Sequence, residues 1–224
     1  MEPFSRENDM NDLRRQGGQT ALATGVWSLW IDMVGGYRVL EGDCFTIGGP
    51  AGDDIADIAV RTAWRRQMAT LSRIGEEFWL ASTAIAGPAS QQALGKPVVL
   101  DARLPIEAED IASTQGQPTL RLKKPSPLSE TMVLTLDPPH RFVCPSDAII
   151  LLDKTILIGP ERTNHIRATQ MLEPGLVVVR QADRWWIRRS SGATEPLRKD
   201  EPVEVGGLVM TLRREVLSPA KEKS

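Results

Sequence analysis

The chain of 224 residues is poor in the side chains that catalysis and metal binding most often use. It contains two histidines, His140 and His165, two cysteines, Cys44 and Cys144, and a single tyrosine. A metal site needs several Cys, His or carboxylate ligands at short spacing, and these four residues do not supply it. Two cysteines also make no disulfide framework, so we interpret both as reduced thiols.

Motifs of the common enzyme classes are missing as well. There is no Gly-x-Ser-x-Gly, no GxxxxGK[ST], no GxGxxG and no paired-carboxylate motif. The acidic turn Gly52–Asp54 lacks the spacing of a calcium-binding loop. His140 follows two prolines and is interpreted as a turn residue, and His165 as a solvated loop residue. We therefore expect no enzymatic activity and no cofactor.

Long apolar runs are absent, and so is a large net charge of either sign. No stretch approaches the roughly 18–20 apolar residues that span a bilayer. The opening segment MEPFSRENDMNDLRRQGG is polar and has no signal-peptide core. The formal net charge of −2 gives no overall field to attract nucleic acid or a membrane surface. These absences predict a cytoplasmic protein that binds neither.

What the sequence does contain is alternation with a period of two residues. Trp27, Leu29 and Ile31 alternate with other residues, which is typical of a strand with one buried face. Similar short segments recur along the chain between Gly, Pro and Asp turns, and helix signals are nearly absent, which predicts an all-β sandwich or barrel. The segment 106–112 is interpreted as loop and edge strand. The predicted strands cover residues 27–32, 37–40, 44–47, 66–71, 78–80, 97–100, 119–122, 132–136, 140–143, 148–152, 155–158, 176–180, 185–188, 201–205 and 208–212.

The chain also repeats itself. In both halves a strand ending in Asp is followed by a turn and later by a strand ending in Ile-Gly. The two isoleucines, Ile47 and Ile158, are 111 residues apart, which is too long for a solenoid repeat and typical of a duplicated domain. We expect Trp79 and Trp186 to be equivalent core residues, with Trp185 partly exposed.

The repeat divides the chain into five parts. The predicted parts are a polar N-terminal tail at 1–25, a first β-sandwich at 26–124, a linker at 125–130, a second β-sandwich at 131–217 and a C-terminal tail at 218–224.

The order of segments resembles that of the forkhead-associated (FHA) domain. The first copy contains FTIGGPAGDDIADIAV, RRQMATLSRIGEEFWL, ALGKPV, IEAEDIAS and TLRL, in the order of that family's Ile-Gly-Arg strand, Ser-Arg-x-His-Ala strand, aromatic hairpin, Asn-Gly turn and closing strands. The likeness covers 26–124 and, more loosely, 131–214. The family folds as a two-sheet sandwich and binds phosphothreonine peptides on loops at one end. The resemblance therefore implies a protein partner, such as a phosphoprotein or a kinase-linked signalling protein.

The residues that bind phosphate in the family are not retained. The arginine after the Ile-Gly turn, suited to phosphate by its planar fork of donors, corresponds to Gly49 and Pro160. The family serine aligns with Arg65, the histidine with Met68, and the asparagine of the Asn-Gly turn with Leu94. The resemblance thus implies two degenerate FHA-like domains and a non-enzymatic, phospho-independent protein-interaction module.

The densest basic and aromatic cluster is RTAWRRQ, and it gives the candidate contact surface Arg61, Trp64, Arg65 and Arg66. A tryptophan between arginines offers stacking and charge to a peptide. In the resembling family the same segment borders the ligand loops. Two alternatives stay open: a phosphothreonine reader that uses Arg61, Arg65 and Arg66, and a carbohydrate-binding or enzymatic β-sandwich.

Overall fold

The structure, a computed structural model, describes residues 23–50, 55–75, 77–82, 96–98, 103–105 and 117–215. All regular structure in these ranges is β, so the predicted all-β fold class is confirmed. The strands are β1 (Gly25–Ile31), β2 (Gly35–Glu41), β3 (Cys44–Gly48), β4 (Ile58–Ala59), β5 (Ala69–Ile74), β6 (Glu77–Ser82), β7 (Lys96–Val98), β8 (Arg103–Pro105), β9 (Thr119–Lys123), β10 (Met132–Leu136), β11 (Ala148–Leu152), β12 (Thr155–Gly159), β13 (Ile166–Arg167), β14 (Leu176–Gln181), β15 (Arg184–Arg189), β16 (Thr194–Pro196), β17 (Val203–Val205) and β18 (Leu208–Arg214).

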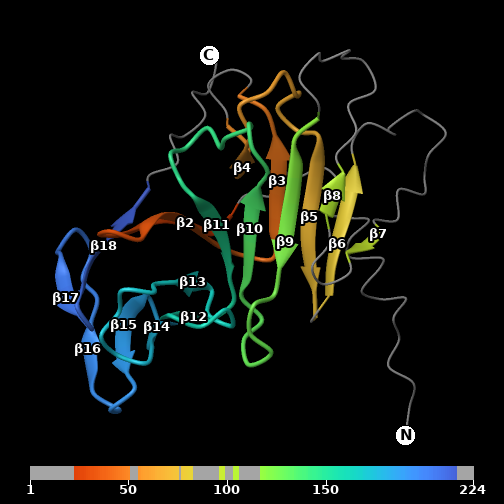
Figure 1. Ribbon diagram of the computed structural model, residues 1–224. Coiled ribbons are helices and arrows are strands. Elements are labelled where there is room, and N and C mark those ends of the chain that lie inside the picture. The colour runs from red at the N-terminus through yellow and green to blue at the C-terminus, as the bar shows by residue number, and fades with distance from the viewer. Residues whose placement is uncertain are drawn as a thin grey trace, which may run out of the picture.

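The strands form one central sheet and two outer sheets (Figure 1). The central sheet has eight strands in the order β17-β18-β1-β2-β11-β10-β9-β8. Val39 of β2 and Ile150 of β11 belong to one hydrophobic core, whereas their neighbours Leu40 and Leu151 belong to the other. Because successive side chains of a strand point to opposite faces, the two cores lie on opposite sides of the central sheet. The molecule therefore has three β layers.

The two outer sheets have the same topology. Their strand orders, β4-β3-β5-β6-β7 and β13-β12-β14-β15-β16, differ only by a shift of nine in strand number. Ile47 of β3 pairs in parallel with Ile58, and Ile158 of β12 pairs in parallel with Ile166. The Ile-Gly segments that marked the repeat in the sequence therefore take equivalent places in the two sheets.

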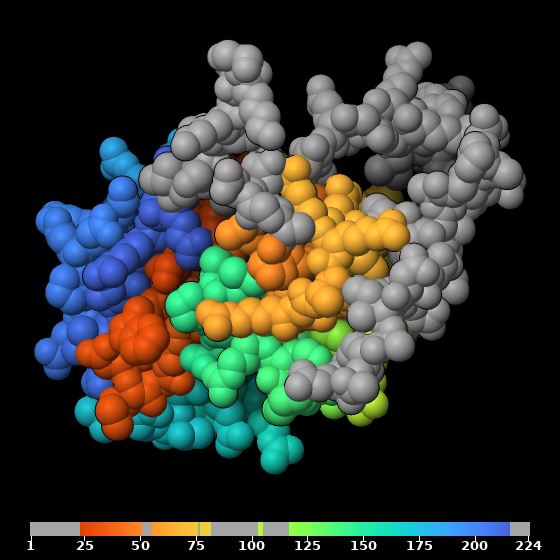
Figure 2. Space-filling view, turned by 90° about the horizontal axis from the view of Figure 1, so that it is seen from above, coloured from red at the N-terminus to blue at the C-terminus, as the bar shows by residue number. Residues whose placement is uncertain are grey.

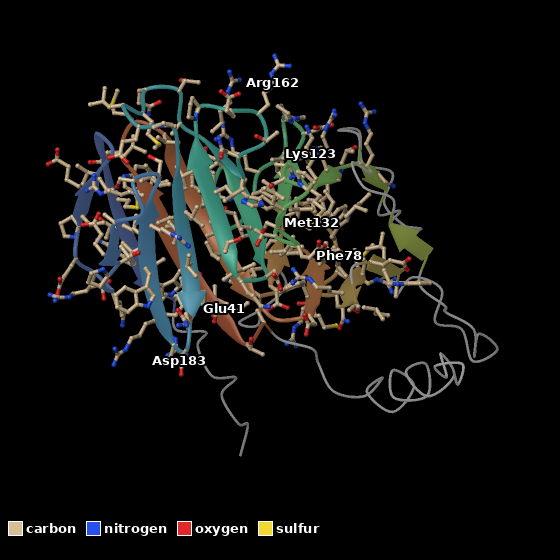
Figure 3. The ribbon with its side chains drawn as sticks, turned by 90° about the horizontal axis from the view of Figure 1, so that it is seen from below. Glu41, Phe78, Lys123, Met132, Arg162 and Asp183 are labelled. Atoms are coloured by element: carbon tan, nitrogen blue, oxygen red, sulfur yellow. The ribbon has the colours of Figure 1, made fainter. Side chains whose placement is uncertain are left out.

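The first two strands of each repeat complete the sandwich of the other repeat. We call the sheet β3–β7 with strands β8–β11 sandwich one, and the sheet β12–β16 with strands β17, β18, β1 and β2 sandwich two. Trp27 and Leu29 of β1 pack in the core of sandwich two, whereas Met132 and Leu134 of β10 pack in the core of sandwich one. Figure 3 places Met132 near Phe78, a core residue from the first repeat. A division of the chain at the predicted linker, 125–130, would therefore cut through both cores.

Two equivalent arginines fasten the exchanged strands. Arg180 lies near the end of β14, paired with Trp185. Its Nε donates to a carboxylate oxygen of Glu41, at the end of β2. Arg73 takes the same place in β5, and its Nη2 donates to the carbonyl oxygen of Leu151, in β11, at 3.3 Å. In Figure 3, Glu41 and Asp183, the two carboxylates bound by Arg180, lie close together. Each guanidinium also lies over an aromatic ring of its own sandwich. Each repeat thus grips a strand of the other.

The aromatic residues of the two hairpins face the opposite way from the sequence expectation. Trp79 and Trp186 are indeed equivalent in register, since each pairs with a proline of the next strand. Both are half-buried, however, and their neighbours Phe78 and Trp185 point into the cores at 4% exposure each. The expectation that Trp186 points inward and Trp185 is partly exposed is wrong. Residues two apart on a strand share a face. Trp185 therefore shares its face with the apolar Ile187, and the two are buried together.

Other expectations differ at their edges. The strand expected at 66–71 begins only at Ala69, and 140–143 forms no strand but a single bridge between Phe142 and Val60. Segment 106–112, Leu94 and nearly all of the two predicted tails lie outside the described residues.

Candidate functional site

The sequence-predicted contact residues lie on the loop that precedes β5. Arg61, Arg65 and Arg66 are exposed there. Trp64 is 5% exposed and belongs to the core of sandwich one together with Met68. Trp64 therefore packs inside the sandwich and is not part of the surface, because burying its large apolar area is favourable. The structure brings the three arginines to one loop and removes the tryptophan from it.

The backbone of this loop fills the space beside the glycines that end β3. The amide of Gly49 donates to the carbonyl oxygen of Arg65 at 2.8 Å. A Cβ added at Gly49 would lie 2.2 Å from the carbonyl oxygen of Trp64, and one at Gly48 would lie 1.8 Å from that of Arg66. No side chain fits at either position. The position that the sequence resemblance aligned with a phosphate-binding arginine is thus closed by backbone.

We expect Gly49→Ala to lower the free energy of unfolding by about 1–3 kcal/mol, the range for overpacking a filled site. A matched control is Gly175→Ala, because the added Cβ there meets only the carbonyl oxygen of Ile158 at an ordinary 3.5 Å. Its effect should stay within about 0.5 kcal/mol. Urea unfolding of both variants measures the difference. Equal stabilities of the two variants would mean that the loop does not press against Gly49 in solution.

The loop before β5 contacts a loop of the second repeat, residues 137–147. Val60 forms an antiparallel bridge with Phe142. The amide of Arg61 donates to the carbonyl oxygen of Arg141 at 2.9 Å, and Arg61 Nη2 donates to that of Val143 at 3.3 Å. Arg141 is exposed. The sequence offered no sign that loop 137–147 lies here, because it belongs to the other copy of the repeat.

The corresponding end of sandwich two offers no fixed set of donors for an anion. A Cβ at Gly159 would lie 2.7 Å from Asn164 Nδ2, and Arg167 Nε donates to the carbonyl oxygen of Pro160 at 3.2 Å. A shallow hollow of about 340 Å³ lies at this end. It is lined by Leu172, Glu173, Arg189, Glu204, Val205, Gly206 and Gly207. Arg189 forms ion pairs with Glu173 and Glu195, so its charge is balanced.

Each sandwich holds one buried polar side chain at the same place. Asp57 accepts the amide proton of Thr46 at 2.8 Å, and His165 Nδ1 accepts that of Leu157 at 2.8 Å. Both therefore bind the strand that ends in Ile-Gly. His165 is 5% exposed, so the expectation of a solvated loop histidine is wrong. Burial lowers its pKa from 6.5 to about 4, although the nearby backbone of Thr131 opposes the shift. The neutral imidazole thus acts as a structural acceptor.

The lowered pKa of His165 predicts a pH dependence of stability. The unfolded chain, with the ordinary pKa of 6.5, takes up the proton first as the pH falls. The contribution of His165 is therefore complete above pH 6.5 and is lost towards pH 4, by roughly 3 kcal/mol in total. Urea unfolding of the wild type and of His165→Gln between these pH values measures it, with His140→Gln as the control. Equal slopes for wild type and His165→Gln would contradict the assignment.

Within the described ranges, no cluster of three or more His, Cys, Asp or Glu side chains is arranged to hold a metal ion. Nor do these ranges contain a helix with the length and hydropathy needed to cross a membrane. No family model, curated protein or solved structure matches the chain.

Proposed function

We propose that the chain is a non-enzymatic protein-interaction module, built from two degenerate FHA-like sandwiches, whose binding does not depend on phosphate. The FHA-like order of segments supports the architecture in the proposal. The closed site at Gly49 is the observation that carries the phospho-independence, because the backbone carbonyl oxygen of Trp64 would lie 2.2 Å from any Cβ there.

Electrostatics favours the same function. When a phosphate binds where no donors are held in place, the free energy of removing its hydration exceeds the free energy gained from the new contacts. The Nη2 of Arg61 already donates a hydrogen bond to the carbonyl oxygen of Val143. Arg61, Arg65 and Arg66 are exposed, and exposed charges are screened over about 8 Å at physiological salt. These arginines therefore supply general attraction to acidic partners without selecting phosphothreonine.

A catalytic role has less support. His165 is buried, and its Nδ1 accepts the amide proton of Leu157. A general base must reach a substrate proton, and a buried structural acceptor does not.

The test compares phosphorylated and unphosphorylated forms of the same peptides at physiological salt. We expect paired affinities within about threefold of each other, which is under 1 kcal/mol. Arg66→Ala should leave that ratio unchanged, as should Arg162→Ala at the other loop end. A micromolar, threonine-selective peptide whose binding is lost in Arg66→Ala would favour the phosphothreonine reader instead.

A further inference from the structure

We infer that the partner-binding surface is shared by both repeats and takes an acidic protein segment that carries one large apolar side chain. This inference rests on the proposed function and assigns its site. We call the set Arg61, Arg141, Trp30 and Met33 the composite surface. Three of these residues come from the first repeat, and Arg141 comes from the second.

The basic half of the composite surface is held by backbone. The hydrogen bond from the Arg61 amide to the Arg141 carbonyl oxygen fixes the two residues beside each other at 2.9 Å. Both side chains are exposed. The described segments 58–68 and 137–147, which form this loop end, carry four arginines against two acidic residues, although the whole chain has a net charge of −2. Of the two acids, Asp137 is paired with Arg121 and Asp147 accepts the amide proton of Gly36. This local excess of positive charge is complementary to an acidic segment.

The apolar half lies at the turn between β1 and β2. Trp30 is 54% exposed, and its Nε1 donates to Asp32 Oδ1 at 2.8 Å, which fixes the indole. Met33, at the tip of the turn, is 93% exposed and has a φ of 62°. Gly or Asn adopts this conformation at lower cost, so folding alone does not account for a methionine there. A strained, exposed apolar residue beside a fixed indole is better explained by contact with a partner.

The two halves adjoin because β2 and β11 are parallel neighbours. The amide of Gly36 donates to Asp147 Oδ2 at 2.9 Å, and the amide of Asp147 donates to the carbonyl oxygen of Gly36 at 2.8 Å. The ring of Trp30 packs over Gly36, 3.1 Å from where a Cβ would stand. Arg38, which is 6% exposed, also donates to Cys144 Sγ at 3.1 Å. Loop 137–147 is therefore anchored beside the exposed indole.

Figure 2 looks down on this end of the molecule. Green atoms of the second repeat lie there between the orange atoms that precede and form β5 and the red atoms of β1 and β2. Arg141 is six residues before Asp147, so their Cα atoms are at most about 20 Å apart. An extended segment of roughly six residues covers that distance. Asp147 contacts Gly36, over which Trp30 packs, so a segment somewhat longer than this is needed to contact Arg141 and Trp30 together.

The chemistry favours a protein segment over nucleic acid. Arginine and tryptophan are the side chains most often responsible for binding energy in protein interfaces. Nucleic-acid binding draws mainly on basic charge spread along a surface. Here the arginines gather at one loop end, with Arg65 and Arg66 on the same loop as Arg61, and the residues beside them at the β1–β2 turn, Trp30 and Met33, are apolar. Carboxylates pair with Arg61 and Arg141, and an aromatic or aliphatic side chain packs on Trp30 and Met33.

The experiment is a selection of phage-displayed random twelve-residue peptides on the full chain. We expect enriched peptides to share acidic residues and one Trp, Phe or Leu at a fixed spacing. Arg141→Glu and Trp30→Ser should each weaken a selected peptide by about tenfold or more. Arg162→Glu, a charge reversal at another exposed arginine, should change its affinity by less than about twofold. Urea unfolding confirms that the variants are folded, and Arg141→Gln provides a milder change.

The outcomes separate the two proposals. Selected peptides that bind Arg141→Glu and Trp30→Ser as well as wild type would overturn the composite surface and leave the interaction module standing. Duplex DNA that competes as strongly as the acidic peptide would reduce the surface to general anion binding and also overturn the inference. A selection that returns no peptide, together with no phosphopeptide binding, would count against both proposals.

Discussion

A single cut between Pro127 and Leu128 is expected to leave the two fragments bound to each other. Leu128 is 91% exposed, so an inserted protease site is accessible there. The cut protein should elute at the mass of the intact chain, 24.7 kDa, and separate only in denaturant. The reason is the exchange: β1 and β2 remain in sandwich two, and β10 and β11 remain in sandwich one.

The expected strength of this association follows from burial. Trp27, Leu29 and Ile31 of β1 are each at most 7% exposed, and all three pack against the second repeat. Each such side chain contributes about 2 kcal/mol, so β1 alone supplies about 6 kcal/mol. Size-exclusion chromatography of the cut protein, with the same sample in urea as the reference, measures the outcome. Two half-sized peaks without urea would mean that each repeat folds on its own strands.

Replacing Trp185 by alanine is expected to lower the free energy of unfolding by about 3–5 kcal/mol. The indole is 4% exposed and packs edge-on against Trp27, with ring centroids 5.5 Å apart. The guanidinium of Arg180 lies 5.3 Å and 5.4 Å from the two ring centroids. Loss of the Trp185 indole leaves a cavity where strand β1 of the first repeat meets β15. The lesion therefore weakens the exchange as well as the core.

The adjacent tryptophan provides the control. Trp186 is half-buried on the other face of the same strand, so Trp186→Ala should cost about 1 kcal/mol. The first repeat offers a second pair, Phe78→Ala against Trp79→Ala, with the same order expected. Urea unfolding at pH 7 measures all four variants. A larger cost for Trp186→Ala than for Trp185→Ala, or for Trp79→Ala than for Phe78→Ala, would show that the buried faces are assigned the wrong way round.

The sequence was sufficient for the strands but not for their partners. Alternation reveals that a strand has a buried face, and Gly and Pro mark its ends, so most strands were predicted. The closing strands of the two repeats, however, read TLRL at 119–122 and TLRR at 211–214. The opening strands β1 and β10 would therefore pair with nearly the same sequence whether they joined the closing strand of their own repeat or that of the other. Nothing local distinguishes pairing within a repeat from exchange between repeats.

The candidate site was predicted in part for the same reason. Exposure of Arg61, Arg65 and Arg66 followed from charge alone. Trp64 was misplaced because its segment does not alternate: it turns inward from an irregular loop. Arg141 was missed because it is near Arg61 only through the contact between the two repeats. Long-range neighbours of this kind leave no periodic signal.

The pairing of β1 with β18 also sets the order in which the protein can be completed on the ribosome. Sandwich one needs no strand beyond β11, so it can close once residue 152 has emerged. Trp27 of β1 pairs with Arg214 of β18, so β1 must wait for β18 to be made. With about 190 residues between them and a synthesis rate of 5–20 residues per second, that wait is on the order of 10–40 s. During this time the backbone groups on the β18 side of β1 are unpaired, and an unpaired strand edge is a site at which other chains can add.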